Sequence, residues 1–351
     1  MPVAPQFAPP PPERPRLALE LLCLGQSLDR VSAQFLFQAL VRGDLSEAEI
    51  AAMLIALRLK GETVEELVGA ATALRAADTD FERPSYLFAD SCGTGGDGSS
   101  SINVSTAVAF VSAAAGLAVV KHGNRSITSR CGSADVLETL GARLEISASA
   151  SRRVLDETGV CFLFAPLYHP GLRHAGPVRR KLKVRTIMNV LGPCLNPAEP
   201  PVQLLGVADP ALLGPVAMTL KELGVEKALV VHGSGLDEMA LHESLAVRLD
   251  GQLPEELSIS PGDAGLEPAP VSALVGGDPA QNAERLVALL SGKGERADRD
   301  VVALNAGGLL MTAGIAPDLK EGVQLASEAL ASGAALERLR SFVEASNDQR
   351  G

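Results

Sequence analysis

Glycine and hydroxyl residues are concentrated in one short segment, "GTGGDGSSSINVST" at residues 93–106, directly before an apolar stretch. Glycine lets backbone N–H groups approach a ligand closely, and Ser, Thr and Asn side chains add further hydrogen-bond donors. A helix that starts after such a loop adds the partial positive charge of its N-terminus. The composition of this segment therefore predicts an anion-binding loop.

The spacing Gly93-x-Gly95-x-x-Gly98 matches a dinucleotide fingerprint, but the rest of that motif is missing. A dinucleotide fold starts its helix at the glycines and carries an Asp or Glu about twenty residues later. Here we expect the helix to start only at residues 101–103, and residues 98–134 contain no acidic residue. No Lys follows the glycines as in a P-loop. Both nucleotide motifs are therefore excluded.

A second polar loop, "KHGNRSITSRCGS" at residues 121–133, follows the apolar run 117–120 and carries Lys121, Arg125 and Arg130. Ligands of α/β sheets bind at the carboxyl ends of strands, where this loop is expected to lie. Two neighbouring loops rich in phosphate donors predict a ligand with phosphate groups at both ends. The alternative is a pair of flexible turns with solvated charges.

Two adjacent carboxylates, Asp237 and Glu238, lie in "HGSGLDEMALH" after the apolar run 227–233. Paired carboxylates with nearby oxygen donors suit Mg²⁺ when substrate phosphates supply most of its ligands. Taken alone, the pair could equally be an exposed acidic turn. Asp97 is an unusual residue for a phosphate loop, and we expect it to accept from hydroxyls or to act through a metal ion.

The composition excludes several classes of protein. The 351-residue chain has a net charge of −11, 3% aromatic residues and no Trp, which argues against a general nucleic-acid binder. We find no secretory signal and no membrane-spanning segment, so a cytoplasmic protein is expected. An odd number of scattered cysteines without a C-x-x-C pair is typical of a reducing compartment. They are Cys23, Cys92, Cys131, Cys161 and Cys194.

Residues 1–16 are rich in Pro, and we predict a disordered tail there. Residues 17–84 are predicted to form a helical domain of about four helices, from their three- and four-residue apolar spacing. Two capping boxes mark helix starts, Ser46 with Glu49 and Thr63 with Glu66. The segment 168–198 carries Pro, His and clustered Arg and Lys, and we expect it to return to this helical domain.

Residues 85–167 and 199–351 are predicted to form a larger α/β domain with a mostly parallel central sheet flanked by helices. Short apolar runs that alternate with helical stretches support this prediction. The predicted strands include residues 117–120, 160–164, 202–208 and 227–233. Helices are predicted to close the chain, at residues 282–292, 298–314 and 319–347.

Four segments together resemble the successive motifs of the anthranilate phosphoribosyltransferase family, from about residue 20 to the C-terminus. They are "GTGGDGSSSINVST", "KHGNRSITSRCGSADVLETLGA", "HPGLRHAGPVRRKLKVRTIMNVLGPCLNPA" and "VVHGSGLDE". The resemblance implies a Mg²⁺-dependent transferase of tryptophan biosynthesis. Such an enzyme moves the 5-phosphoribosyl group from phosphoribosyl pyrophosphate to the amine of anthranilate and releases pyrophosphate.

The resemblance also implies site residues. The catalytic groups would be Lys121, Asp237 and Glu238, and two Mg²⁺ ions would use Ser105, Asp237 and Glu238. Anthranilate would contact Gly93, Asn124 and Arg179. By side-chain chemistry alone, Arg180 could bind the anthranilate carboxylate as well as Arg179, because both lie on one basic helix. Phosphoribosyl pyrophosphate would contact Gly93, Gly96, Asp97, Ser101, Asn103, Val104, Ser105, Thr106, Lys121, His122, Gly123, Asn124, Arg125, Ser126, Ile127, Thr128, Ser129 and Ser133.

The chain departs from the family pattern at a few positions. Cys131 stands where Ser is usual, which could change one donor of the phosphate loop. Cys194, Leu195 and Met188 also differ, and we interpret these three as packing variation. His169 is a further candidate neighbour of the pocket.

Other functions stay open at this point. A pyrimidine nucleoside phosphorylase shares the architecture, a relative could bind nucleic acid without catalysis, and a transferase could use another acceptor. The family also implies a homodimer formed through the helical domain, and no nucleic-acid or membrane partner.

Overall fold

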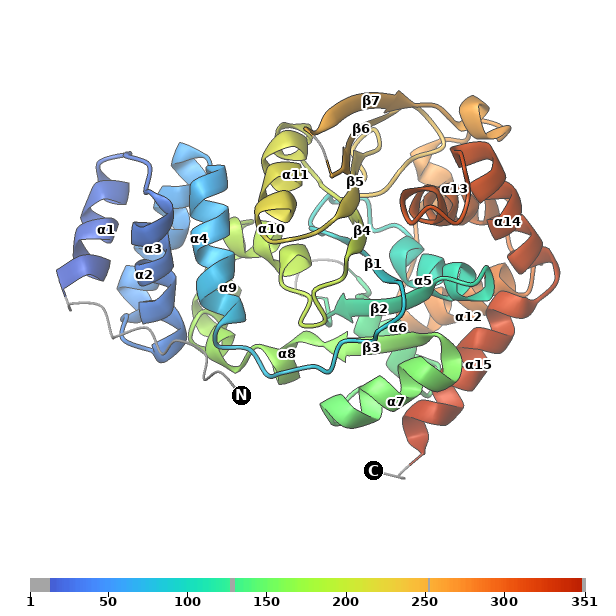
Figure 1. Ribbon diagram of the computed structural model, residues 1–351, viewed down its shortest axis with the longest axis horizontal. Coiled ribbons are helices and arrows are strands. Elements are labelled where there is room, and N and C mark those ends of the chain that lie inside the picture. The colour runs from blue at the N-terminus through green and yellow to red at the C-terminus, as the bar shows by residue number, and fades with distance from the viewer. Residues whose placement is uncertain (1–12, 127–129, 252, 349–351) are drawn as a thin grey trace.

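The structure is a computed structural model that describes residues 13–126, 130–251 and 253–348. At one end of the molecule lies a bundle of helices, drawn in blue in Figure 1. Its helices are α1 (Glu13–Cys23), α2 (Arg30–Arg42), α3 (Glu47–Lys60) and α4 (Val64–Arg75). A later segment, which we call the return segment, packs against this bundle. It comprises α8 (Ala165–Tyr168), η1 (Pro170–His174), α9 (Gly176–Leu182) and α10 (Ile187–Cys194).

Both predicted capping boxes are confirmed. The Ser46 hydroxyl accepts from the Glu49 N–H at 3.3 Å, and Glu49 Oε2 accepts from the Ser46 N–H at 2.8 Å. Thr63 and Glu66 form the same pair of bonds. Glu66 is fully buried and also accepts from the Leu28 N–H and from Lys60 Nζ. The Glu66 carboxylate therefore links the start of α4 to the residues just before α2.

The prediction of a tail over residues 1–16 is wrong for its last four residues. Residues 13–16 form the first turn of α1, and Pro15 is buried there. Proline is tolerated in a first turn because the N–H groups of that turn have no partner within the helix. Residues 1–12 lie outside the described part of the chain.

The seven strands in the described part of the chain form one sheet in the order β3-β2-β1-β4-β5-β6-β7. The first five of these are parallel, and β6 and β7 add to one edge in antiparallel fashion. The predicted fold class is confirmed, with four of the strands near the predicted runs. The bounds are β1 Phe88–Gly93, β2 Ala118–Gly123, β3 Val160–Phe164, β4 Val202–Gly206, β5 Lys227–His232, β6 Ser244–Asp250 and β7 Glu255–Ile259.

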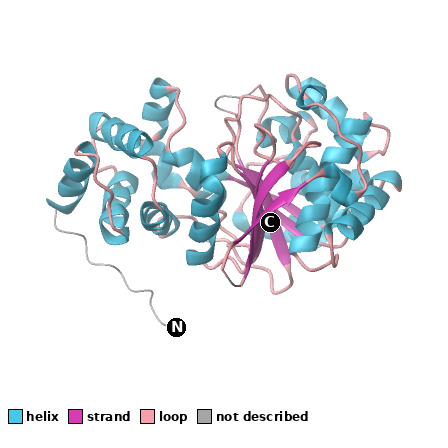
Figure 2. Ribbon diagram, turned by 90° about the horizontal axis from the view of Figure 1, so that it is seen from above, coloured by secondary structure: helices cyan, strands magenta, loops and turns pink. Residues whose placement is uncertain are grey.

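Helices cover both faces of the sheet (Figure 2). On one face, helices α5 (Val104–Ala114) and α13 (Arg296–Thr312) pack on the central strands. The other helices of this layer are α6 (Ser133–Thr139), α7 (Ala148–Thr158), α12 (Pro279–Leu290), α14 (Leu319–Ala331) and α15 (Ala334–Asn347). The predicted helix 319–347 is thus two helices, separated at Ser332 and Gly333. None of the described helices combines the length and apolarity needed to span a membrane.

The opposite face of the sheet carries α11 (Leu213–Glu222) and faces the helical bundle. Buried side chains of the bundle, of the return segment and of this face form one continuous apolar cluster. Leu54 of α3, Met188 of α10, Leu205 of β4 and Val230 of β5 all belong to it. The bundle therefore shares its core with one face of the sheet.

The strand order reverses beside β1, because the chain runs outward through β2 and β3 and then returns to β4 on the other side of β1. Such a reversal leaves a crevice at the carboxyl ends of the strands, where α/β folds bind their ligands. The two predicted loops follow β1 and β2 at this edge.

We predict that Glu66→Ala lowers the free energy of unfolding by about 3 kcal/mol, because it leaves the buried Lys60 ammonium and two backbone N–H groups without their acceptor. Glu49→Ala, which removes the same type of cap at the surface, should cost only about 1 kcal/mol. Urea denaturation of both variants measures the difference. Equal losses would contradict this account of Glu66.

Candidate active site

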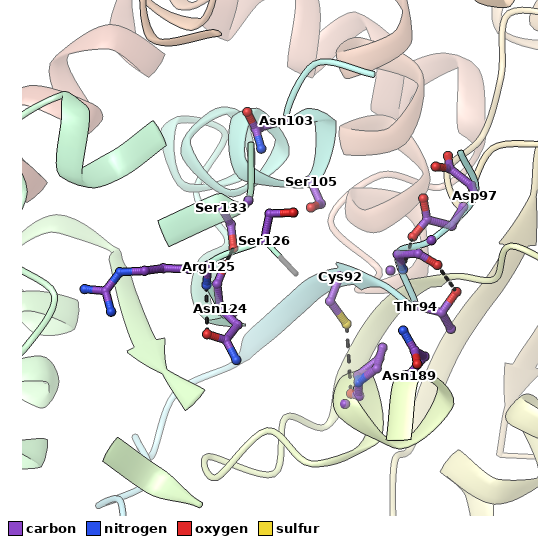
Figure 3. A pocket seen from close by; sticks show the side chains of 18 of the residues that line it. Cys92, Thr94, Asp97, Asn103, Ser105, Asn124, Arg125, Ser126, Ser133 and Asn189 are labelled. Carbon is purple, nitrogen blue, oxygen red and sulfur yellow. Dashed lines mark hydrogen bonds between the residues drawn. The ribbon is translucent and has the colours of Figure 1, made fainter. Parts of the chain in front are cut away.

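A cavity of about 350 Å³ lies at the carboxyl ends of the strands. It is lined by the loop after β1, the loop after β2, the return segment and the carboxylates after β5. Figure 3 shows Asp97 on one side of it and Asn124, Ser126 and Ser133 on the other.

The cavity gathers every sequence-predicted site residue that the structure describes. Ile127, Thr128 and Ser129 lie outside the described residues. Arg179 lines the cavity and its neighbour Arg180 does not, which separates the two arginines that the sequence left equivalent. The predicted residues on the lining are Gly93, Gly96, Asp97, Ser101, Asn103, Val104, Ser105, Thr106, Lys121, His122, Gly123, Asn124, Arg125, Ser126, Ser133, Arg179, Asp237 and Glu238.

The loop after β1 has a backbone that only glycine adopts easily. Gly95 and Gly96 have φ values of 65° and 73°, in the left-handed region. Asp97 stabilises the next turn, because its carboxylate accepts from the Ser99 hydroxyl at 2.7 Å and from the Ser99 N–H at 3.1 Å. This agrees with the expectation that Asp97 accepts from hydroxyls. Helix α5 then begins at Val104 and directs its N-terminus toward the cavity.

Asp237 packs against the ends of strands β1 and β4. A Cβ at Gly93 would overlap the Asp237 carboxylate, and a Cβ at Gly206 would overlap the Asp237 carbonyl. Glycine at these ends of β1 and β4 therefore makes room for the loop that carries the acidic pair. Asp237 Oδ2 accepts from the Gly95 N–H at 2.6 Å, so the acidic loop also holds the glycine loop.

Negative charge is buried at this point. Burial raises the pKa of Asp237 to about 7, and the nearby Asp97 charge adds to the shift. Burial also raises the pKa of Glu238 well above its usual range, with a further contribution from Asp237 and an opposing one from Lys121. Crowded carboxylates of this kind favour a bound cation.

The donor set suits Mg²⁺, because it consists of carboxylate oxygens with the Ser105 hydroxyl nearby. Among the described residues no group of three or more His, Cys, Asp or Glu side chains is arranged to hold a metal by itself. A magnesium ion here would take most of its ligands from substrate phosphates and water.

Lys121 is the buried cation of the site. Its Nζ donates to the Ser91 carbonyl at 2.6 Å and to the Ser105 hydroxyl at 3.0 Å. The fully buried Asp90 accepts from Asn196 Nδ2 at 2.9 Å. Burial raises the pKa of Asp90, and the Lys121 charge opposes that shift. Asp90 therefore lies where it can balance the Lys121 charge.

The Arg125 side chain is not oriented as a phosphate ligand would be. Its guanidinium donates to Glu138 at 3.0 Å and to Glu145 at 3.2 Å, and lies over the Phe164 ring. The side chain extends away from the other labelled residues in Figure 3. Only a rotation of this side chain would bring its charge to a phosphate, so its predicted role stays a prediction.

The return segment forms an apolar wall that sequence reasoning largely missed. Met188 and Leu195 line the cavity, so two of the three supposed packing variants belong to the site, whereas Cys194 does not line it. Arg179 and Lys183 are the cationic side chains of this wall, and burial lowers the pKa of Arg179. Lining residues within the two predicted loops that had no individual assignment are Thr94, Ser99, Ser100, Ile102 and Gly132. Lining residues outside those loops that were not predicted are Cys92, Ala165, Leu172, Lys183, Val184, Asn189, Gly192 and Pro193. Cys131 also lines the cavity, and Asn103 Nδ2 donates to its carbonyl at 3.3 Å.

We predict that Asp237→Asn leaves the metal-free protein as stable as the wild type or more stable at pH 8. The folded pKa of Asp237 lies above its unfolded value, so its carboxyl favours folding at low pH and loses that contribution as the pH rises through about 7. The amide oxygen of Asn can still accept from the Gly95 N–H. Thermal unfolding in EDTA at pH 5 and pH 8 measures this, with added Mg²⁺ expected to stabilise only the wild type. A variant less stable than the wild type at pH 8 would contradict the prediction.

Family models match both parts of the chain. Residues 16–77 match the helical bundle domain of the glycosyl transferase family, and residues 85–336 match the a/b domain of that family. A relative from Sorangium cellulosum, named anthranilate phosphoribosyltransferase, is 58% identical over 331 residues, or 94% of this chain and 95% of the relative.

Solved structures agree with these matches. The anthranilate phosphoribosyltransferase of Thermus thermophilus has a TM-score of 0.90 and 42% identity, covering 94% of this chain and 99% of that one. The enzyme of Saccharomyces cerevisiae, solved in complex with PRPP and Mg, has a TM-score of 0.86 and 26% identity, covering 95% and 97%. The same yeast enzyme with 4-fluoroanthranilate has a TM-score of 0.86 and 25% identity, covering 96% and 98%.

These matches extend over nearly the whole chain and confirm the resemblance found in its motifs. The chain is a glycosyltransferase-family enzyme, and it belongs to the anthranilate phosphoribosyltransferase family.

Proposed function

We propose that the protein transfers the 5-phosphoribosyl group of phosphoribosyl pyrophosphate to the amine of anthranilate. The products are pyrophosphate and N-(5-phosphoribosyl)anthranilate, an intermediate of tryptophan biosynthesis. The observation that carries this proposal is a single cavity with two different sides. One side offers anion donors and buried carboxylates, and the other offers an apolar wall with one arginine.

The donor would lie across the loops after β1 and β2. The N–H groups near Gly95, the N-terminus of α5 and the hydroxyls of Ser101 and Ser105 can hold the diphosphate. Asn124 and Ser133, on the second loop, can hold the phosphate at the other end of the sugar. The yeast relative solved with PRPP and Mg supports a donor of this class.

Ser105, Asp237 and Glu238 would hold Mg²⁺, and we propose two ions. Bound there, magnesium neutralises the charge that develops on the departing pyrophosphate. This assignment rests on the raised pKa values of the two buried carboxylates, which favour a cation between them and the substrate.

Anthranilate would lie against the return segment. Its ring fits the apolar wall that includes Leu172 and Met188, and its carboxylate fits the Arg179 guanidinium. The yeast relative solved with 4-fluoroanthranilate supports an acceptor of this shape.

The reaction breaks the bond between the anomeric carbon and pyrophosphate and forms a bond to the amine nitrogen. Lys121, held at Ser91 and Ser105, keeps a positive charge close to the leaving group. The aromatic amine is neutral at pH 7, so the chemistry needs no strong base to activate it. The chain's own task is to position two substrates and to stabilise charge.

The proposal includes a homodimer that pairs through the helical bundle. Leu17 of α1 and Leu24, just after that helix, are 57% and 73% exposed, and Leu59 of α3 is 81% exposed, which provides an apolar surface for a partner. It also includes a cytoplasmic location, where the exposed thiol of Cys23 stays reduced.

The direct test follows the loss of anthranilate fluorescence when protein, phosphoribosyl pyrophosphate and Mg²⁺ are mixed. We expect a loss that stops on addition of EDTA. A parallel assay with thymidine and inorganic phosphate tests the nucleoside phosphorylase alternative. No change with anthranilate, or turnover of thymidine, would refute the proposal.

We predict that Arg179→Ala raises the KM for anthranilate about tenfold or more and leaves the KM for phosphoribosyl pyrophosphate within about twofold, because one bidentate ion pair to the acceptor is lost. Arg180→Ala is the matched control, since its side chain comes from the next position of α9 and does not line the cavity. Steady-state kinetics with each substrate varied in turn give both constants. Similar effects of the two variants would assign the acceptor's carboxylate elsewhere.

A further inference from the structure

Three buried titratable side chains form a chain of hydrogen bonds behind the cavity. His169 Nδ1 lies 2.6 Å from Asp78 Oδ1, and His169 Nε2 lies 2.9 Å from His122 Nε2. The side chains of His169 and Asp78 are 3% and 10% exposed. Asp78 follows α4, His169 lies between α8 and η1, and His122 belongs to β2. The bundle, the return segment and the sheet meet at this chain.

The contact between the two rings fixes where protons lie. Two ring nitrogens at hydrogen-bond distance need one donor and one acceptor. The Asp78 carboxylate beside His169 Nδ1 favours the tautomer that carries its proton on that nitrogen. His169 Nε2 is then the acceptor, and His122 Nε2 is the donor.

His169 Nδ1 then donates to the Asp78 carboxylate in a charge-assisted hydrogen bond. Arg75 and Glu199 also interact electrostatically with Asp78, and Lys121 does so with His122, whose backbone N–H donates to Asp90. The carboxylate of Asp78 is what allows both histidines to keep their bonds at once.

These two histidines belong to the wall of the cavity, whereas Asp78 does not line it. Successive side chains of a strand point to opposite faces. On β2, Lys121 reaches toward Ser91 and Ser105, on the donor side, and His122 reaches toward His169 of the return segment. Any rotation of the His122 or His169 ring would therefore change the acceptor side of the cavity and leave the donor side in place.

We propose that Asp78 is a positioning residue that sets the protonation and orientation of His169 and His122, and through them the wall against which the acceptor packs. This inference rests on the proposed function, because it assigns the acceptor to that wall. Asp78 acts through the two rings and does not touch the substrate.

The test compares Asp78→Asn with Asp80→Asn, an exposed carboxylate two positions along the same linker. Asn keeps the shape of Asp78 but removes the carboxylate charge that favours the proton on His169 Nδ1. We expect Asp78→Asn to raise the KM for anthranilate about tenfold, with the KM for phosphoribosyl pyrophosphate within about twofold, as for the loss of a charge-assisted hydrogen bond. The Asp80→Asn control should match the wild type.

A second measurement is independent of activity. Ring nitrogen NMR shifts report which nitrogens carry protons, and the chain has only 5 histidines to assign. We expect His122 and His169 to carry their protons on the same ring nitrogens in the wild type and in Asp80→Asn, and this assignment to change in Asp78→Asn.

The inference is overturned if Asp78→Asn leaves both ring signals unchanged, or if it raises both KM values together with a fall in thermal stability, as a merely structural residue would. An absence of transfer by the wild type refutes the proposed function instead. The NMR result identifies which of the two has failed.

Discussion

Buried negative charge at the carboxyl edge of the sheet is the constraint on which the rest of the site depends. Asp237 is half-buried and Glu238 is buried at the wall of the cavity, and Asp97 adds a third carboxylate that interacts with both. Burying carboxylates side by side without a bound cation lowers the stability of the folded protein. On the proposed function, bound cations and a polyanionic substrate would offset this cost.

The surrounding structure serves this arrangement through backbone contacts. The glycines at the ends of β1 and β4 leave the space into which the Asp237 backbone fits, and the Gly95 N–H fixes the Asp237 carboxylate. Under the cavity, Asp90 and Asn196 hold β1 and β2 together beyond the strand pairing of Ala89 with Val119, since Asn196 Nδ2 also donates to the Val120 carbonyl. Beside Lys121, hydrogen bonds of the Asp90 and Asn196 side chains therefore take the place of backbone hydrogen bonds between β1 and β2.

Local patterns predicted the parts of the molecule that local chemistry determines. Capping boxes, glycine-rich loops and the adjacent carboxylates each need particular residues at short spacing, and the described members of these sets lie where the sequence suggested. Strand β1 was missed because Asp90 and Ser91 interrupt its apolar pattern, and β7 because its side chains are mostly exposed. The contact of Asp78 with His169 joins residues 91 positions apart, and no spacing rule detects such a pair. The apolar wall was missed for the same reason, since its members come from separate turns of the return segment.

The apolar cluster shared by the bundle and the sheet has a consequence for how this architecture can evolve. Leu54 and Val230 are buried in the same apolar cluster although they come from different sequence-family regions. A gene fusion or exchange that replaced the bundle alone would expose one side of the sheet to water. The two regions are therefore expected to be inherited as a pair. On the proposed function, changes of acceptor are expected to arise by substitution in the return segment and not by recombination of whole modules.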